Sequence, residues 1–244
     1  MKKVFKLLII CVLILSYSCT DKVDFHPENE RIWLHRANSI EKARQYQYQY
    51  GGLEVDVFFN DSLQTFEIKH DPDEVPKLTL NEWCDALETI SQTGVWFDFK
   101  NLNHDNCQQA LRCLKEIRRR HHMKGRLYVE SSSYDQLLPF QKEGFLVSYY
   151  IPDFNPWMED SATYLPYTKF IQDAIDKGVN DISGFDYQYH FLKKTYPKQP
   201  KLIWTVSEDP AWQARFIETV SKDSLVEVIL LPLVKDCDHP TPGF

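Results

Sequence analysis

Carboxylate and histidine residues stand at the ends of short apolar runs in the first part of the sequence. Glu54 and Asp56 are two residues apart in a Leu-Glu-Val-Asp-Val run, and His35 and His70 each close an apolar segment. Side chains two apart on a β-strand point to the same side. Glu54 and Asp56 can therefore offer oxygen ligands to one hard cation such as Mg²⁺ or Ca²⁺.

Asp98 and Lys100 repeat this spacing within a second apolar run. Charged side chains set in apolar strands are expensive to bury unless they are paired or bound to a metal. Three carboxylates and a lysine that meet at one place would bind a divalent cation and leave the ammonium for an anionic substrate. A buried structural ion pair between Asp98 and Lys100 is the alternative.

The elements that must position these residues follow from the hydrophobic pattern. Short apolar or β-branched runs alternate with longer amphipathic segments, which predicts repeated β–α units. The expected strands are 32–35, 52–58, 65–70, 94–100, 126–130, 144–150, 181–185, 201–206 and 226–231. The expected helices are 40–50, 80–91, 105–122, 134–143, 166–177, 188–196 and 209–219. Thr79 with Glu82 has the pattern of a capping box at the beginning of the second helix.

This order of elements predicts the α/β class and a (β/α)₈ TIM-type barrel in one domain, residues 31–244. An open, doubly wound sheet has the same periodicity. In a barrel the reactive residues stand at the C-terminal ends of the strands. His35, Glu54, Asp56 and His70 all fall at or near such ends, so the barrel interpretation gathers them around one mouth.

The composition and net charge limit the kinds of molecule that this protein is expected to bind. The formal net charge is −7, the sequence pI is about 5.6, and 43% of the residues are hydrophobic. This is the composition of an ordinary globular protein, and it provides no long-range attraction for polyanions. We expect a monomer without a nucleic-acid partner, and we assign the basic run 118–122 to the end of a solvated helix.

The N-terminus has the features of an export signal. Lys2 and Lys3 precede an apolar stretch of roughly eleven residues, too short to span a bilayer. Small and polar residues then lead to Cys19, as in bacterial lipoprotein signals. We expect a signal peptide over 1–18, lipidation of Cys19 and a tether over 19–30, which would hold the domain on a membrane of the cell envelope. Secretion without a lipid is the alternative.

Export would leave four cysteines in the folded domain. They are Cys84, Cys107, Cys113 and Cys237, and their spacing matches no metal-site pattern. One or two disulfides are compatible with an oxidising compartment, but the sequence does not indicate which cysteines would pair.

Three motifs together resemble a known superfamily. They are His35-Arg36-Ala37-Asn38-Ser39, Glu54-Val55-Asp56 and His70-Asp71. In this order and spacing they are similar to the opening of the glycerophosphodiester phosphodiesterases and the wider phosphatidylinositol phospholipase C-like barrels. A later run, Trp204-Thr205-Val206, resembles a late barrel strand of the same group.

The resemblance implies a role for each matching residue. It implies that His35 and His70 are the acid–base pair and that Glu54, Asp56 and Asp98 are the ligands of a divalent cation. It also implies that Lys100 contacts the phosphate and Trp204 lines the pocket. Arg36 either binds phosphate or packs beside His35. The implied activity is metal-dependent hydrolysis of a phosphodiester such as a glycerophosphodiester or a phospholipid headgroup.

Several positions depart from the glycerophosphodiesterase pattern. Ala37 replaces the usual glycine, Asp98 stands where Glu is usual, and the family's usual Thr-Asp is missing from the last strand. The segment 70–80 is also too short for the family's insertion. The Asp-x-Lys pattern is more similar to sphingomyelinase D-type and menorin-like enzymes. The alcohols of the substrate are therefore not predicted.

Two alternatives remain open at the sequence level. One is a non-catalytic envelope lipoprotein that binds a glycan or a lipid headgroup. The other is a glycoside hydrolase, although Glu54 and Asp56 lie side by side on one strand, which suits a cation better than a sugar. Glu130, at the end of another expected strand, is either a further ligand or a solvated residue. Four aromatic residues at and after the end of the sixth expected strand either cover the substrate or pack a loop: Tyr149, Tyr150, Phe154 and Trp157.

Overall fold

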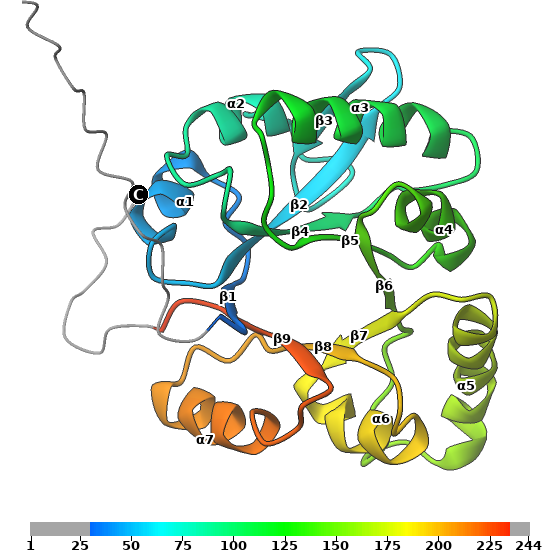
Figure 1. The fold of residues 1–244 in the computed structure, drawn as a ribbon. Coiled ribbons are helices and arrows are strands. Elements are labelled where there is room, and N and C mark those ends of the chain that lie inside the picture. The colour runs from blue at the N-terminus through cyan, green and yellow to red at the C-terminus, as the bar shows by residue number, and fades with distance from the viewer. Residues whose placement is uncertain (1–29, 235–244) are drawn as a thin grey trace, which may run out of the picture.

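The computed structural model describes residues 30–234. The predicted signal peptide, lipidated Cys19, most of the tether, and Cys237 lie outside these residues. In the described part, a ring of strands is surrounded by helices (Figure 1). The strands are β1 (Ile32–Leu34), β2 (Gly52–Asn60), β3 (Thr65–Ile68), β4 (Gly94–Phe99), β5 (Leu127–Ser131), β6 (Leu146–Tyr150), β7 (Asp181–Phe185), β8 (Lys201–Trp204) and β9 (Val226–Leu231).

Eight of these strands close a parallel barrel, which confirms the predicted (β/α)₈ fold. The order β1-β9-β8-β7-β6-β5-β4-β2 returns to its beginning because β1 also pairs with β2. β3 is outside this ring. It pairs antiparallel with the C-terminal part of β2, where Val57 lies opposite Ile68. The expected strand 65–70 is therefore half of a hairpin above the barrel, and this hairpin brings His70 to the mouth.

The helices match the predictions in number but not in their bounds. They are α1 (Ile40–Tyr46), α2 (Leu80–Asp85), α3 (Cys107–Arg120), α4 (Tyr134–Lys142), α5 (Ser161–Asp176), α6 (Tyr189–Thr195) and α7 (Pro210–Val220), with a short 3₁₀ turn over Asp186–Gln188. The capping box of Thr79 and Glu82 is present at α2.

The two largest errors in the helix predictions have local causes. We expected a helix over 80–91, but α2 ends at Asp85 because the buried Gln47 side chain accepts the N–H groups of Glu88 and Thr89, which satisfies them outside a helix. We expected another helix to begin at Pro166, but α5 begins at Ser161 because the Asp160 side chain caps it, and Pro166 lies inside.

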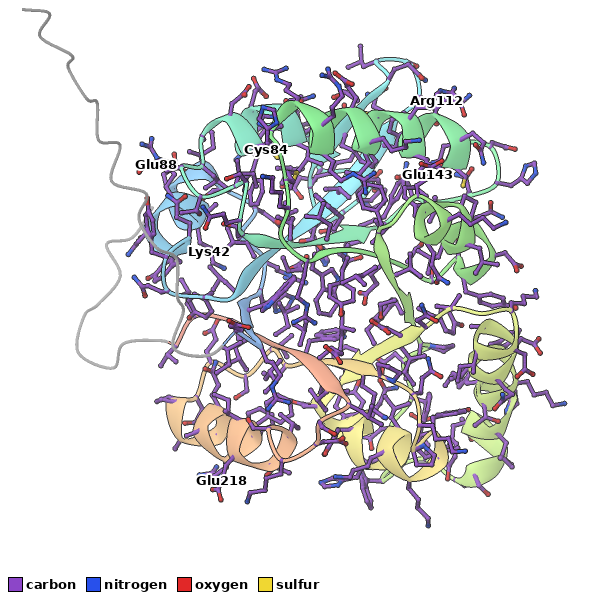
Figure 2. The ribbon with its side chains drawn as sticks, in the orientation of Figure 1. Lys42, Cys84, Glu88, Arg112, Glu143 and Glu218 are labelled. Carbon is purple, nitrogen blue, oxygen red and sulfur yellow. The ribbon has the colours of Figure 1, made fainter. Side chains whose placement is uncertain are left out.

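Apolar residues form two separate cores. The larger lies between the barrel and the helices, where side chains such as Cys84 of α2 turn inward (Figure 2). The smaller fills the barrel interior and consists of Trp33, Trp96, Tyr128, Leu202, Val228 and Leu230. Gly52 and Gly94 are paired across β2 and β4, and a Cβ on either would lie about 2.5 Å from the Trp33 ring. Trp33 therefore closes the N-terminal end of the barrel interior, and a cavity lies at the opposite, C-terminal end.

One carboxylate is buried deep in the barrel. Asp181 begins β7 opposite Ser148, and burial raises its pKa to about 6 against the opposing hydrogen bond from Tyr128. A folded-state pKa above the unfolded one means that folding favours the protonated form. Its contribution to stability is therefore lost as the pH rises from about 4 through 6.

We predict that Asp181→Asn raises the free energy of unfolding by roughly 1–3 kcal/mol at pH 8 and changes it much less at pH 4. Thermal melting at both pH values measures this difference, with the exposed Asp173→Asn on α5 as the control. An equal change at both pH values would contradict the assignment of the raised pKa to Asp181.

Candidate active site

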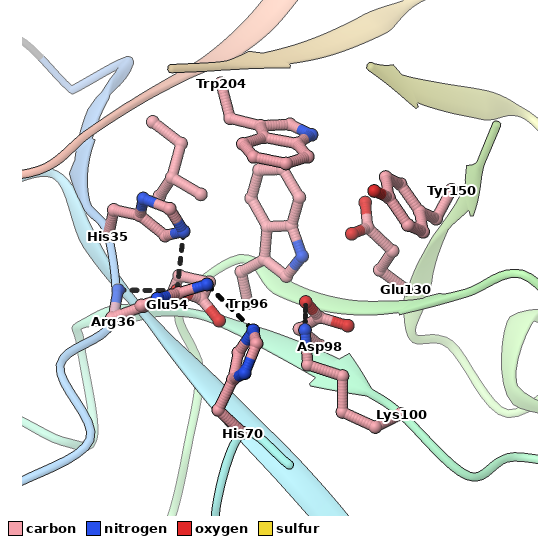
Figure 3. Close-up of a pocket in the computed structure, with 11 residues that line it drawn as sticks. His35, Arg36, Glu54, His70, Trp96, Asp98, Lys100, Glu130, Tyr150 and Trp204 are labelled. Carbon is pink, nitrogen blue, oxygen red and sulfur yellow. Dashed lines mark hydrogen bonds and ion pairs between the residues drawn. The ribbon is translucent and has the colours of Figure 1, made fainter. Parts of the chain in front are cut away.

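The barrel mouth holds a cavity of about 90 Å³ (Figure 3). Its lining residues come from the C-terminal ends of the strands and the loops after them: His35, Arg36, Glu54, His70, Trp96, Asp98, Lys100, Glu130, Tyr150, Trp204 and Leu230. Asp56 is buried directly beside them and contacts Lys100. The structure thus brings together all eight predicted site residues of the described chain.

Three of the carboxylates form a group that can hold a metal ion. Oxygen atoms of Glu54, Asp56 and Asp98 all lie within 4.8 Å of one another. Asp56 and Asp98 are neighbours on adjacent strands, and Glu54 is two residues before Asp56. Oε1 of Glu54 is buried without a hydrogen-bond partner. An all-oxygen set with a free, buried carboxylate oxygen fits a hard divalent cation.

Hydrogen bonds fix the orientation of two of these carboxylates. The Asn38 side chain donates to Oδ2 of Asp56 at 2.6 Å and accepts the Asp56 backbone N–H at 3.0 Å. The Arg36 backbone N–H donates to Oε2 of Glu54 at 2.6 Å. Arg36 has a left-handed backbone, with φ at 52°, which is uncommon for a residue other than glycine. The positive φ therefore falls on Arg36 and not on Ala37, where the family's glycine stands.

Burial and mutual repulsion destabilise the ionised forms of the carboxylates in this group. Burial, and then the charges of Asp56 and Asp98, raise the pKa of Glu54 well above its usual range. Burial also raises the pKa of Asp98, although Lys100 opposes it. A cation between these carboxylates would offset both costs.

We predicted that the Lys100 ammonium is left for a substrate, but in the structure it contacts two carboxylates. Its Nζ lies 2.8 Å from Oδ1 of Asp56 and also donates to Asp98. Burial opposes the positive charge, but the two carboxylates outweigh it and raise the pKa of Lys100. The ammonium is therefore paired with both carboxylates, because two negative charges at hydrogen-bonding distance attract it strongly.

His35 is held neutral by its surroundings. Burial, and then the charge of Arg36, lower its pKa to about 3, although Asp56 acts in the opposite direction. Its Nε2 lies 3.9 Å from Oε2 of Glu54 (Figure 3). A neutral imidazole at neutral pH has a free lone pair, so His35 can accept a proton.

His70 lies across the cavity and contacts Arg36. The Arg36 guanidinium lies 2.7 Å from Nε2 of His70, and Nδ1 lies 3.0 Å from Oδ1 of Asp71. A guanidinium can only donate, so Nε2 accepts here and the proton resides on Nδ1, facing Asp71. This arrangement joins Arg36 to His70, whereas packing beside His35 was the sequence-level alternative.

Aromatic rings form the wall opposite β2. Trp204 lies 5.7 Å from the His35 ring, 5.9 Å from the Tyr150 ring and 3.7 Å from the Phe185 ring, between centroids. Trp204 therefore lines the cavity, where the resemblance implied that it would lie. Of the four aromatic residues at the end of β6 and in the loop after it, only Tyr150 lines this cavity; Tyr149 and Phe154 are buried in the outer core, and Trp157 is exposed.

Glu130 is the site residue that sequence reasoning left undecided. It is the last residue but one of β5, lies opposite Asp98 and is 3% exposed, so it is not a solvated residue. Burial and the charge of Asp98 raise its pKa well above the usual range. Its place at a strand end, in the same pattern as Asp98, was the signal available in the sequence.

Other candidate features of the sequence do not form sites in the described residues. Cys84, Cys107 and Cys113 are free thiols there. His121 pairs with Asp85 across 3.8 Å, and the carboxylate group is the one potential metal cluster found in residues 30–234. None of the helices in this range has the length and apolar character needed to cross a membrane.

No protein-family profile and no curated protein matches this sequence. Solved structures do match the fold. A glycerophosphodiester phosphodiesterase from Thermotoga maritima is 15% identical, with 84% of this chain and 96% of that chain covered and a TM-score of 0.56. An Oleispira antarctica phosphodiesterase in complex with the product sn-glycerol-3-phosphate is 11% identical, with 82% and 92% covered and a TM-score of 0.55.

The similarity extends to phospholipase barrels. A calcium-dependent phosphoinositol-specific phospholipase C from a Pseudomonas species is 11% identical, with 82% of this chain and 87% of that chain covered and a TM-score of 0.50. The chain therefore has the same barrel fold as these two phosphodiesterases and this phospholipase C.

Proposed function

We propose that this chain is a metal-dependent phosphodiesterase in which His35 and His70 transfer the protons. The observation that carries the proposal is the placement of two histidines on either side of a three-carboxylate group inside one barrel mouth. Phosphodiester cleavage needs a base for the attacking hydroxyl, an acid for the departing alkoxide, and positive charge near the phosphoryl oxygens. This site contains candidates for each.

The proposed base is His35. Its Nε2 faces the cavity beside Glu54, and its neutral ring has a lone pair that can take a proton from the attacking water or from a neighbouring hydroxyl of the substrate as the new P–O bond forms. The proposed acid is His70, whose Nδ1 faces Asp71; a carboxylate there stabilises the imidazolium that donates its Nε2 proton to the departing alkoxide.

This assignment requires Arg36 to change its acceptor. A protonated Nε2 cannot accept the hydrogen bond that the guanidinium now donates to His70. A phosphoryl oxygen at the mouth is the natural replacement because guanidinium groups bind such oxygens with paired N–H groups. We therefore assign Arg36 to the phosphate, and its move toward the phosphate would free His70 for protonation.

Glu54, Asp56 and Asp98 would hold the cation, which we propose to be Mg²⁺ or Ca²⁺. Bound there, the ion would supply Lewis-acid stabilisation of phosphoryl charge. Lys100 stays beside Asp56 and Asp98 and contributes a second positive charge to the same side of the cavity. Trp204 closes the wall behind the His35 ring.

Phosphorus NMR of a panel of diesters tests the proposal. Glycerophosphodiesters, lysophospholipids, sphingomyelin and phosphoinositides are incubated with the protein in Mg²⁺ or Ca²⁺. We expect at least one diester to yield a monoester, or a cyclic phosphate if a substrate hydroxyl attacks. Complete stability of every diester, together with tight binding of a headgroup, would instead indicate a non-catalytic binding protein.

We also propose that the enzyme is exported and lipid-anchored at Cys19, on the cell-envelope side of a membrane. The support is the short apolar stretch before Cys19. We predict that Cys19→Ala moves the protein from the membrane fraction to the soluble fraction, which fractionation and immunoblotting measure. A variant that stays with carbonate-washed membranes would refute the anchor without affecting the catalytic proposal.

A further inference from the structure

The loop between β1 and α1 determines the geometry of much of the barrel mouth. It runs from His35, the proposed base, to Ser39. Two of its residues orient the proposed metal ligands. The Arg36 backbone N–H donates to Glu54, and the Asn38 side chain binds both the carboxylate and the backbone N–H of Asp56. The conformation of this loop therefore sets the positions of the base and of two carboxylates together.

Two side chains from outside the loop hold its carbonyl groups. Lys42 of α1 donates from Nζ to the His35 carbonyl at 2.7 Å (Figure 2). Trp83 of α2 donates from Nε1 to the Ala37 carbonyl at 2.8 Å, and both of these residues are 0% exposed. Neither Lys42 nor Trp83 is among the residues that line the cavity. Their contacts can therefore act on the site only through the backbone of the loop.

The Lys42 contact reaches Glu54 through a single peptide group. The His35 carbonyl and the Arg36 N–H belong to the same planar unit, so fixing the direction of one fixes the other. Lys42 binds this unit at its oxygen, and Oε2 of Glu54 accepts from its N–H at 2.6 Å. An ammonium at the oxygen also polarises the peptide group, which strengthens the hydrogen bond that its N–H donates. Lys42 thus supports the orientation of the Glu54 carboxylate.

The Trp83 contact reaches Asp56 by the next part of the loop. The Ala37 carbonyl shares its peptide unit with Asn38, whose side chain donates to Oδ2 of Asp56 at 2.6 Å. The Ala37 N–H donates to the Glu54 carbonyl at 2.8 Å, which ties the loop to β2 from the other side. Without the indole N–H, the buried Ala37 carbonyl would lose this partner, which is unfavourable. The loop would then have to move, and Asn38 would move with it.

The residue between the two held carbonyls has a strained backbone. Arg36 has φ at 52°, a left-handed conformation that a residue other than glycine keeps only where its surroundings enforce it. The contacts of Lys42 and Trp83 lie immediately before and after it in the loop. Their positions are those that would enforce the conformation of Arg36.

We propose that Lys42 and Trp83 are positioning residues that hold the β1–α1 loop, and through it Glu54 and Asp56, in the geometry of a cation site. This inference rests on the proposed function and extends it to two residues that touch neither the substrate nor the ion. Loss of either contact leaves every carboxylate in place but loosens the arrangement that the cation requires.

Binding of the metal alone tests the proposal without turnover. Mg²⁺ or Ca²⁺ is titrated while the melting temperature is recorded, and the cation concentration that gives half of the maximal increase is compared. Trp83→Phe removes the N–H and keeps an aromatic ring, and Lys42→Met removes the ammonium and keeps an unbranched stem. We expect each to raise this concentration about tenfold, as for other groups that orient metal ligands. Lys42→Arg retains a donor and should recover part of the loss.

Two matched controls separate positioning from general stability. Trp33 donates its indole N–H to the Glu30 carbonyl at 3.0 Å, and Lys201 donates from Nζ to the Tyr196 carbonyl at 3.0 Å. Trp33→Phe and Lys201→Met therefore remove the same kinds of contact at the N-terminal end of the barrel. Both should lower the melting temperature in a chelator and leave the half-maximal cation concentration unchanged.

Kinetics provides the second readout. At a saturating cation concentration, kcat of Lys42→Met and Trp83→Phe should stay roughly tenfold below that of the native protein, because the base on the loop is displaced as well. The two control variants should keep native kcat.

The outcomes distinguish this proposal from the proposed function. An unchanged half-maximal cation concentration in Lys42→Met would overturn the positioning role, even if Trp83→Phe failed to fold. A native protein whose melting temperature does not respond to either cation would overturn it as well. Weaker cation binding in the variants, together with no hydrolysis of any diester by the native protein, would support the positioning role and refute the catalytic function.

Discussion

Replacing His35 or His70 with alanine is expected to lower kcat on a hydrolysed diester by about 10²–10⁴, the usual cost of losing an acid–base catalyst. Both residues follow strand ends at the barrel mouth and lie outside the apolar core clusters. The melting temperature should change less than for the loss of an apolar core side chain, because both rings border the cavity at the barrel mouth. Initial rates at saturating substrate measure the effect.

The two histidines should differ in one respect. Some substrates have a leaving group, such as a nitrophenolate, that departs without being protonated. With such a substrate, His70→Ala should lose much less activity than it does with an alkyl diester. His35→Ala should remain as impaired as before. His104→Ala, in an exposed loop that does not line the cavity, is the matched control. Near-native kcat in either site variant would remove that histidine from the mechanism.

The second large effect is expected for Glu54→Gln. In the native protein, a cation at one hundred times its dissociation constant should add about 2.7 kcal/mol to the free energy of unfolding. For a domain of this size, that corresponds to roughly 5–10 °C in melting temperature. Glu54→Gln should abolish most of this shift and most of the hydrolysis, because it removes one charged ligand from the group of three.

The same variant should be more stable than the native protein in a chelator. Its amide still offers an oxygen to the Arg36 N–H, and it removes a buried charge that Asp56 and Asp98 repel. Asp105→Asn removes the same charge from a fully exposed loop and should leave the metal-dependent shift intact. If Glu54→Gln kept the full shift, the cation would bind elsewhere.

The barrel and most of its site were predictable because strand alternation is a strict geometric rule. Glu54 and Asp56, or Asp98 and Lys100, must share a face at a two-residue spacing. Strand ends must gather at one mouth once the barrel closes. These two rules are sufficient to place six of the eight described site residues around the cavity and Asp56 beside it, whereas His70 reaches the cavity through the β2–β3 hairpin.

What the sequence did not predict depends on tertiary contacts. Nothing in the local pattern shows that Thr65–Ile68 pairs antiparallel with β2, or that Gln47 ends α2 by binding the N–H groups of Glu88 and Thr89. The engagement of Lys100 by Asp56 and Asp98, and the burial of Glu130, also depend on neighbours across strands. Such distances are set by packing and not by sequence spacing.

The central claim is that the carboxylate group and the two histidines act as one metal-dependent phosphodiesterase site. The most direct test is the rate of hydrolysis of one responsive diester before chelation, after chelation, and after Mg²⁺ or Ca²⁺ is returned. The account predicts that hydrolysis stops in the chelator, recovers when the ion is returned, and fails to recover in Glu54→Gln. Hydrolysis that continues unchanged in the chelator would contradict it.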